Sequence, residues 1–116
     1  MDRIYGPDFQ AKMLAVACRE PLFLAHYSEA LLPQIFSSNY LRDLSSWILE
    51  YYGKYNNPPT QVGLRTIVES HVPADAPTLP GYQLLLQQIF TCDLSDATYV
   101  QEQLCTAARH LAVRTA

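Results

Sequence analysis

The chain has 116 residues, which suffice for one compact domain spanning 1–116 and are too few for two. Hydrophobic residues make up 49% and charged residues 16%, a balance that predicts a folded protein and excludes a disordered one. The formal net charge is −3 and the eight lysines and arginines are scattered, which argues against autonomous nucleic-acid binding. Low charge also leaves apolar side chains over for the surface, a hint of a partner or of self-association.

Two helices are expected in the first part of the chain. Asp8 is a suitable N-cap for the first of them. Apolar residues then recur at helical spacing: Phe9, Met13, Val16 and Ala17. Pro21 ends this helix, because proline restricts the residue before it and lacks the N–H that helical bonding requires. A short second helix would place three apolar residues on one face: Leu22, Phe23 and Tyr27.

The strongest helical pattern covers about residues 38–55 and follows an apolar anchor at Phe36. Its apolar stripe recurs in steps of three and four: Leu41, Leu44, Ile48, Tyr51 and Tyr55. A stripe this broad is typical of the central helix of a small bundle. We therefore expect Tyr51 and Tyr55 to bury their rings and to reach outward with their hydroxyls.

On the polar face of this helix, Glu50 and Lys54 stand at i and i+4 and should interact. Residues 56–59, Asn-Asn-Pro-Pro, form a connector, and Thr60 can cap a fourth helix. One side of that helix would carry Val62 or Leu64, together with Ile67, Val68 and His71. The stretch Val72–Gly81 holds three of the eight prolines and is expected to be a loop.

Two helices close the chain. Leu79–Cys92 is almost wholly apolar, which is expected of a helix in the middle of a bundle or between two partners. The last helix starts at Asp93, Ser95 or Asp96, and no glycine or proline ends it before Ala116, so we expect the natural protein to continue. Strand alternation and hairpin turns are absent from the sequence. The predicted fold is all-α, a compact bundle of about six helices with a C-terminal helical hairpin.

The sequence contains no recognisable catalytic, cofactor or metal site. Its glycines do not fit the phosphate-binding pattern GxxxxGK[ST], so this chain is not expected to hydrolyse ATP. Cys18, Cys92 and Cys105 fit neither a disulfide framework nor a zinc pattern, and no two histidines stand at i and i+4. Asp93 and Asp96 are explained as helix caps. We expect no enzyme activity, no cofactor and no metal.

The sequence also bears on location. No apolar run is long enough to span a membrane, and the N-terminus lacks a signal-peptide pattern. Unpaired thiols suit a reducing compartment. A cytoplasmic protein without membrane contact is therefore predicted.

Several long segments carry a family resemblance. A helix beginning PDFQAKMLAVACREPLFL is followed by LLPQIFSSNYLRDLSSWILEYYGKYNNPPTQVGLRTIVES, and the chain closes with GYQLLLQQIFTC and DATYVQEQLCTAARHLAVRTA. This order resembles the N-terminal domain of DnaB-type replicative DNA helicases, particularly the phage and plasmid versions. In that family an aromatic anchor, here Phe36, precedes a long helix, and a capped helix, here Thr60–Ser70, follows a short turn. One departure is VPADAPTLPG, which stands where many members carry a glycine-rich turn.

The resemblance implies a helical, non-catalytic domain that pairs through a closing hairpin, builds a collar over the motor ring and helps to dock primase or a loader. This chain would then be an assembly and docking module excised from a longer helicase. Its partners would be further copies of itself and primase or a helicase loader, without direct nucleic-acid binding. We expect interface residues on the closing helices, at positions that helical spacing assigns equally well to the core: Leu86, Phe90, Val100, Leu104 and Leu111.

Two other functions fit parts of the sequence. The helicase-binding domain of a primase has a similar helical shape, and the position of the domain in the full gene would separate it from a helicase domain. A small helical DNA-binding protein could use Thr60–His71 as its recognition helix. That helix carries only Arg65 as a cation, whereas base reading needs several polar side chains backed by phosphate contacts.

Overall fold

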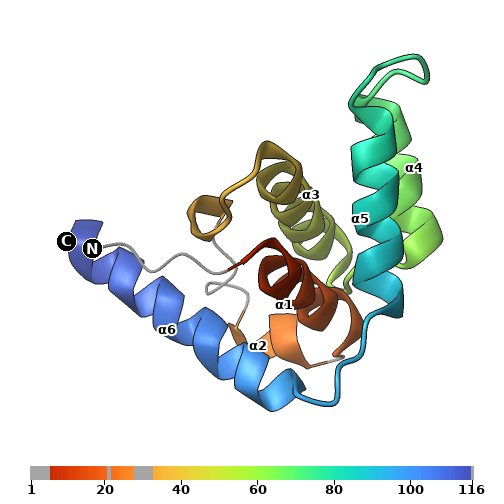
Figure 1. The fold of residues 1–116 in the computed structure, drawn as a ribbon. Helices are drawn as coiled ribbons and strands as arrows, with labels where there is room; N and C mark the ends of the chain where they lie inside the picture. The colour runs from red at the N-terminus through yellow and green to blue at the C-terminus, as the bar shows by residue number, and fades with distance from the viewer. Residues whose placement is uncertain (1–5, 21, 28–32, 116) are drawn as a thin grey trace.

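The computed structural model describes residues 6–20, 22–27 and 33–115, and every regular element within these residues is helical. The prediction of an all-α fold is confirmed. The elements are α1 (Pro7–Arg19), α2 (Phe23–Tyr27), the 3-10 turn η2 (Pro33–Ile35), α3 (Asn39–Tyr55), α4 (Gln61–His71), α5 (Leu79–Thr91) and α6 (Ala97–Thr115) (Figure 1).

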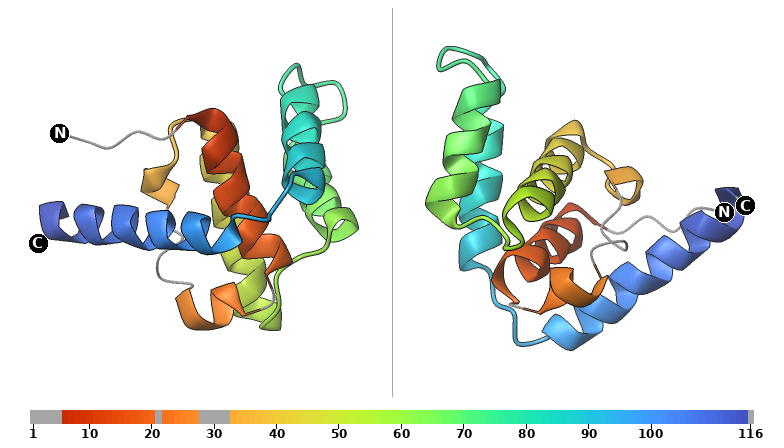
Figure 2. Two further views of the ribbon diagram at one scale, coloured as in Figure 1. Left: turned by 60° about the horizontal axis from the view of Figure 1, so that its bottom comes forward. Right: turned by 180° about the vertical axis from the view of Figure 1, so that it is seen from behind.

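Helix α1 lies at the centre of the fold, with α3, α5 and α6 packed around it (Figures 1 and 2). Most of its side chains are buried, among them Ala11, Met13, Leu14, Ala15, Val16 and Ala17, and three of these are alanines. Alanine lets neighbouring helices approach closely from several directions. The expectation that α3 is the central helix is therefore wrong, because α3 buries one stripe and leaves its opposite face exposed. Helix α1 ends ahead of Pro21, which itself lies outside the described residues.

The start and end of α3 follow from capping chemistry. Phe36 is fully buried just before the helix, as expected of an anchor. Gln10, a buried side chain of α1, accepts a hydrogen bond from the Ser37 N–H through Oε1 at 2.9 Å and so fixes this segment. Ser38 is the N-cap, and its Oγ accepts from the N–H three residues on at 3.1 Å. Asn56 ends the helix in the left-handed region, at φ 60°, which asparagine tolerates well.

Helices α4 and α5 form an antiparallel pair beside α1 and α3 (Figures 1 and 2). Thr60 caps α4 as predicted, since its Oγ1 accepts from the Gly63 N–H at 3.1 Å. Leu64 is buried and Val62 is exposed, which resolves the choice between them for the inner face. The loop at residues 72–78 lies at one end of this pair, and the α3–α4 connection lies at the other (Figures 1 and 2).

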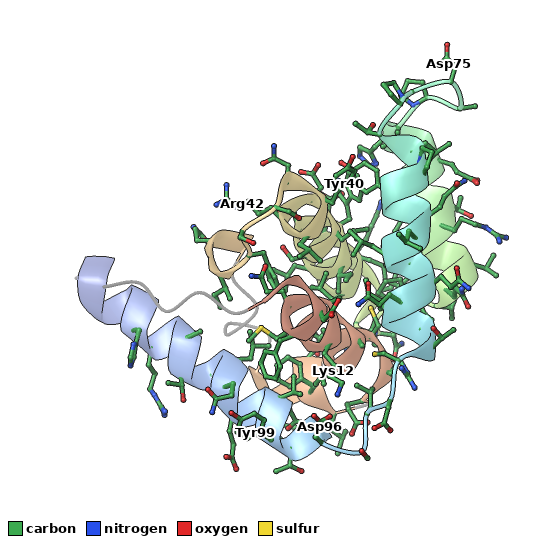
Figure 3. All side chains as sticks on the ribbon, in the orientation of Figure 1. Lys12, Tyr40, Arg42, Asp75, Asp96 and Tyr99 are labelled. Atoms are coloured by element: carbon green, nitrogen blue, oxygen red, sulfur yellow. The ribbon has the colours of Figure 1, made fainter. Side chains whose placement is uncertain are left out.

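The last two helices differ from the expected hairpin. Helices α5 and α6 diverge after the turn at residues 92–96, and each packs on α1 rather than along the other (Figure 2). The inward-facing apolar residues of both helices are buried in this shared core: Leu86, Ile89, Val100 and Leu104. An ion pair fixes the start of α6, with Lys12 Nζ 2.9 Å from Asp96 Oδ1 (Figure 3). The antiparallel pair of this fold is α4–α5.

Candidate interaction surface

Four of the five residues expected at an interface belong to one core. Leu86, Val100 and Leu104 are buried where α1 meets α5 and α6. Phe90 is half-buried and packs against the same core. Leu111 belongs to α6, but its side chain lies outside the described residues. A contact between any of these residues and a partner stays a prediction, and a surface for partners has to be sought elsewhere on the described chain.

Large apolar side chains that are exposed lie on different elements. They are Leu22, Tyr55, Val62, Leu84 and Tyr99. Leu84 is 66% exposed on the outer side of α5. The helix packs on both α1 and α4, and these two partners account for most of its apolar sequence. The expectation that Leu22 shares a face with Phe23 is wrong, because Leu22 is exposed and Leu24 is buried instead. The side chain of Tyr27 lies outside the described residues. Single exposed apolar residues are normal, so these positions alone define no patch.

Aromatic rings gather where α3 meets α4 and α5. The rings of Tyr40 and Trp47 lie 4.7 and 5.7 Å from the ring of Tyr82, measured between centroids. His71 stacks on Trp47 at 4.7 Å, and its Nδ1 lies 2.9 Å from the Ile67 carbonyl oxygen, which holds the imidazole in place. Edge-on and stacked pairs of this kind add stabilisation beyond the area they bury. We call Tyr40, Trp47, His71 and Tyr82 the aromatic cluster; it joins the α4–α5 pair to α3.

Tyr82 and Gly81 determine how closely α5 packs against α3 in the aromatic cluster. The Tyr82 hydroxyl donates a hydrogen bond to Asp43 Oδ2 at 2.7 Å, and the side chain is only 7% exposed. Burial, and then the hydrogen bond to the Asp43 carboxylate and its charge, raise the pKa of Tyr82 to about 12. Gly81 faces Tyr40 so closely that a Cβ atom there would lie 2.7 Å from Tyr40 Cε1. The aromatic cluster is thus a tightly packed contact between α3 and the α4–α5 pair, and the buried Tyr82 hydroxyl remains a neutral hydrogen-bond donor.

The last turn of α3 carries a second group of rings, at the surface. Tyr51 and Tyr55 lie with their centroids 4.6 Å apart, and Lys54 Nζ lies 5.8 Å from the centre of the Tyr55 ring. Tyr51 is half-buried, but Tyr55 is 55% exposed, so the expectation that Tyr55 buries its ring is wrong. Lys54 forms no ion pair with any described carboxylate, so the expected pairing with Glu50 is wrong too. We call Tyr51, Lys54 and Tyr55 the tyrosine end.

The loop after α4 is held in shape by its own backbone hydrogen bonds. The Ala76 N–H donates to the Pro73 carbonyl at 3.0 Å, and the Leu79 N–H donates to the Ala76 carbonyl at 3.2 Å. Asp75 is exposed at the far end of the α4–α5 pair and points into solvent (Figure 3). It forms no ion pair with a described cation. We call residues 73–78 the tip; its Pro73 and Pro77 are exposed on either side of Asp75.

The titratable groups outside the cluster have structural explanations. Burial raises the pKa of Cys18 to about 12, and burial is also the main cause that raises the pKa of Cys105, so both stay protonated thiols at neutral pH. Asp93 accepts hydrogen bonds from the Ser95 hydroxyl and N–H, which lower the pKa of Asp93. Within the described residues, no group of three His, Cys, Asp or Glu side chains is placed to hold a metal ion.

One surface depression, of about 570 Å³, follows α6. Its described lining comes from that helix alone: Thr98, Gln101, Glu102, Gln103, Cys105, Thr106 and Arg109. No described histidine lines the depression, and burial raises the pKa of the Cys105 thiol in its wall. None of the described helices is both long and apolar enough to cross a membrane.

The features that sequence reasoning missed are contacts between distant segments. The close approach of Gly81 to Tyr40 had one signal, an isolated glycine inside a helical pattern, which often has a packing reason. The stack of His71 on Trp47 had none. Comparison of the chain with protein-family models, with curated proteins and with solved structures gives no significant match.

Proposed function

We propose that this chain is a non-catalytic assembly and protein-docking module of a replicative DNA helicase, which oligomerises and contacts primase or a helicase loader during DNA replication in the cytoplasm. One observation supports the proposal: the elements on which the resemblance rests stand in the expected order. Phe36 is buried directly ahead of the capped long helix α3, and α4 begins at its cap Thr60 after a short turn.

Two described surface features offer places for such contacts. The tip is held by backbone hydrogen bonds, and the rings of the tyrosine end contact each other at a tilted angle of 44°, so both surfaces are already ordered before a partner binds. Preordered contact groups lower the entropic cost of association. Tyrosine is moreover among the residues enriched in protein interfaces, because its ring is apolar and its hydroxyl is polar.

Binding to the replication partners tests this function. Purified primase and helicase loader from the same replication system are titrated into the chain by calorimetry. Self-association of the chain is followed in parallel by sedimentation velocity. We expect binding to at least one of the two partners and an average mass that rises with concentration. A folded chain that stays monomeric and binds neither partner would overturn the proposal.

The same samples separate the alternatives. Binding to the helicase instead of to primase or loader would identify the helicase-binding domain of a primase. Binding to duplex DNA that weakens steeply with salt would favour a DNA-binding protein, because phosphate contacts release counterions. The exposed side of α4 carries Arg65 as its cation, so we expect no such DNA binding.

A further inference from the structure

The tip and the tyrosine end carry complementary chemistry. The tip presents a carboxylate, Asp75, between two exposed prolines. The tyrosine end presents an ammonium group, Lys54, above an exposed tyrosine ring. Proline-rich segments dock on aromatic surfaces, and opposite charges fix the register of such contacts. Neither Asp75 nor Lys54 has an ion-pair partner among the described residues.

Within one chain the two surfaces cannot meet. They lie at opposite ends of α4, because the tyrosine end precedes the α3–α4 connection and the tip follows the last turn of α4 (Figures 1 and 2). Helix α4 has 11 residues, so the two surfaces stand about 16 Å or more apart. A rigid helix therefore holds each surface ready for a second molecule.

We propose that the tip of one copy of this chain docks on the tyrosine end of a second copy, with Asp75 beside Lys54 and a tip proline against Tyr55. This inference rests on the self-association in the proposed function and names the surfaces that carry it. The contact is heterologous, since each copy uses two different surfaces. Such contacts repeat from copy to copy and give a closed ring or an open filament, depending on the rotation between neighbours.

A charge exchange tests the contact. Asp75→Lys and Lys54→Asp each set like charges against one another, and each should weaken self-association by about tenfold at low salt. The double variant restores opposite charges in the exchanged order, so its association should return close to that of the unchanged chain. Both side chains are exposed, and circular dichroism checks that every variant remains folded. Glu69→Lys makes the same charge change as Asp75→Lys on an exposed position of α4 and should leave association unchanged.

The measurement is sedimentation velocity over a range of chain concentrations at low and at high salt. The contact would be supported if self-association weakened in each single variant, if this weakening became smaller at high salt, and if the double variant associated like the unchanged chain. Unchanged association in both single variants, or no recovery in the double variant, would overturn it. A chain that binds primase or loader but stays monomeric would overturn this inference and leave the docking function standing. A chain that self-associates by this contact and binds neither partner would instead remove the helicase assignment.

Discussion

Gly81→Ala is expected to destabilise the protein, although alanine is the better helix former. Gly81 lies in the first turn of α5, where alanine would normally stabilise the helix by up to about 1 kcal/mol. The added Cβ, however, would lie 2.7 Å from Cε1, 2.8 Å from Cζ and 3.0 Å from the hydroxyl oxygen of Tyr40. Separations this short force the ring of Tyr40 to move.

The cost of moving the Tyr40 ring decides whether Gly81→Ala raises or lowers the free energy of unfolding. Overpacking of this kind costs about 1–3 kcal/mol, and the displaced ring also gives up its edge contact with Tyr82 at 4.7 Å. Set against the gain in helix propensity, the free energy of unfolding should fall by about 1 kcal/mol. In a Tyr40→Ala background the clash is gone, and the same glycine substitution should stabilise by up to about 1 kcal/mol. The coupling between Gly81 and Tyr40 is then about 2 kcal/mol, within the range for contacting residues.

Urea unfolding measures these differences. Trp47 is the single tryptophan of the chain and lies in the aromatic cluster, so its fluorescence reports on this joint, and circular dichroism reports on the helices. Gly53→Ala is the matched control, because a Cβ at Gly53 would meet nothing within 4 Å, and it should stabilise α3 by up to about 1 kcal/mol. If Gly81→Ala stabilised the intact chain as much as Gly53→Ala does, the reasoning about the joint would be refuted.

Three further substitutions or reagents probe other parts of the structure. Tyr82→Phe leaves the Asp43 carboxylate without its donor and should lower the free energy of unfolding by about 1 kcal/mol at neutral pH, measured in urea. Because folding raises the pKa of Tyr82 from 10.0 to about 12, its contribution is complete below pH 10 and is lost as the pH rises towards 12, so the variant should lose less stability over that window. Leu86→Asp buries a carboxylate in the core and should abolish helical circular dichroism; a folded variant with weaker self-association would instead place Leu86 at an interface. Cys18 is half-buried and its raised pKa keeps the thiol protonated, so it should react more slowly with iodoacetamide in the folded chain than in urea, and equal labelling rates in the two states would contradict the raised pKa.

The local helical signals were strong enough to predict most elements. The cap at Thr60 stands where the sequence placed it, because a side-chain oxygen that accepts from a helix N–H acts over three residues and needs no distant partner. The predicted cap at Asp8 is wrong, because α1 begins at Pro7 after Gly6 and Asp8 lies within its first turn. The all-α class follows from the same local signals. The loop after α4 was predicted from its prolines, but its end was placed at Gly81, whereas Leu79, Pro80 and Gly81 form the first turn of α5, where proline is tolerated.

Whether the tyrosines at the end of the α3 stripe are buried depends on where the core ends. Leu41, Ile48 and Tyr55 stand seven residues apart, and an α-helix drifts by about 20° for every seven residues. Over two such steps the stripe turns away from the core, and the Pro58–Pro59 connector leads the chain on towards α4. Leu41 and Ile48 are therefore buried while Tyr55 is exposed.

Packing between distant helices was beyond the sequence pattern. A stripe shows that a helix has an inner face, but it does not show which helix that face meets. Helical spacing assigned Leu86 and Val100 equally well to an interface and to the core, and the structure buries both in the core around α1. The alanines of α1 carry little hydrophobic signal, yet their small size is what allows this helix to be surrounded.

The central position of α1 affects how the chain folds during its synthesis. Lys12 pairs with Asp96, which is 84 residues further along, so the ribosome completes the first helix long before its last neighbours exist. At synthesis rates of about 5–20 residues per second, the interval is roughly 4–17 s. During that time the apolar faces of α1 have no α5 or α6 to cover them. The nascent chain is then most exposed to aggregation and to chaperone binding, and its folding must wait for the final helix to emerge.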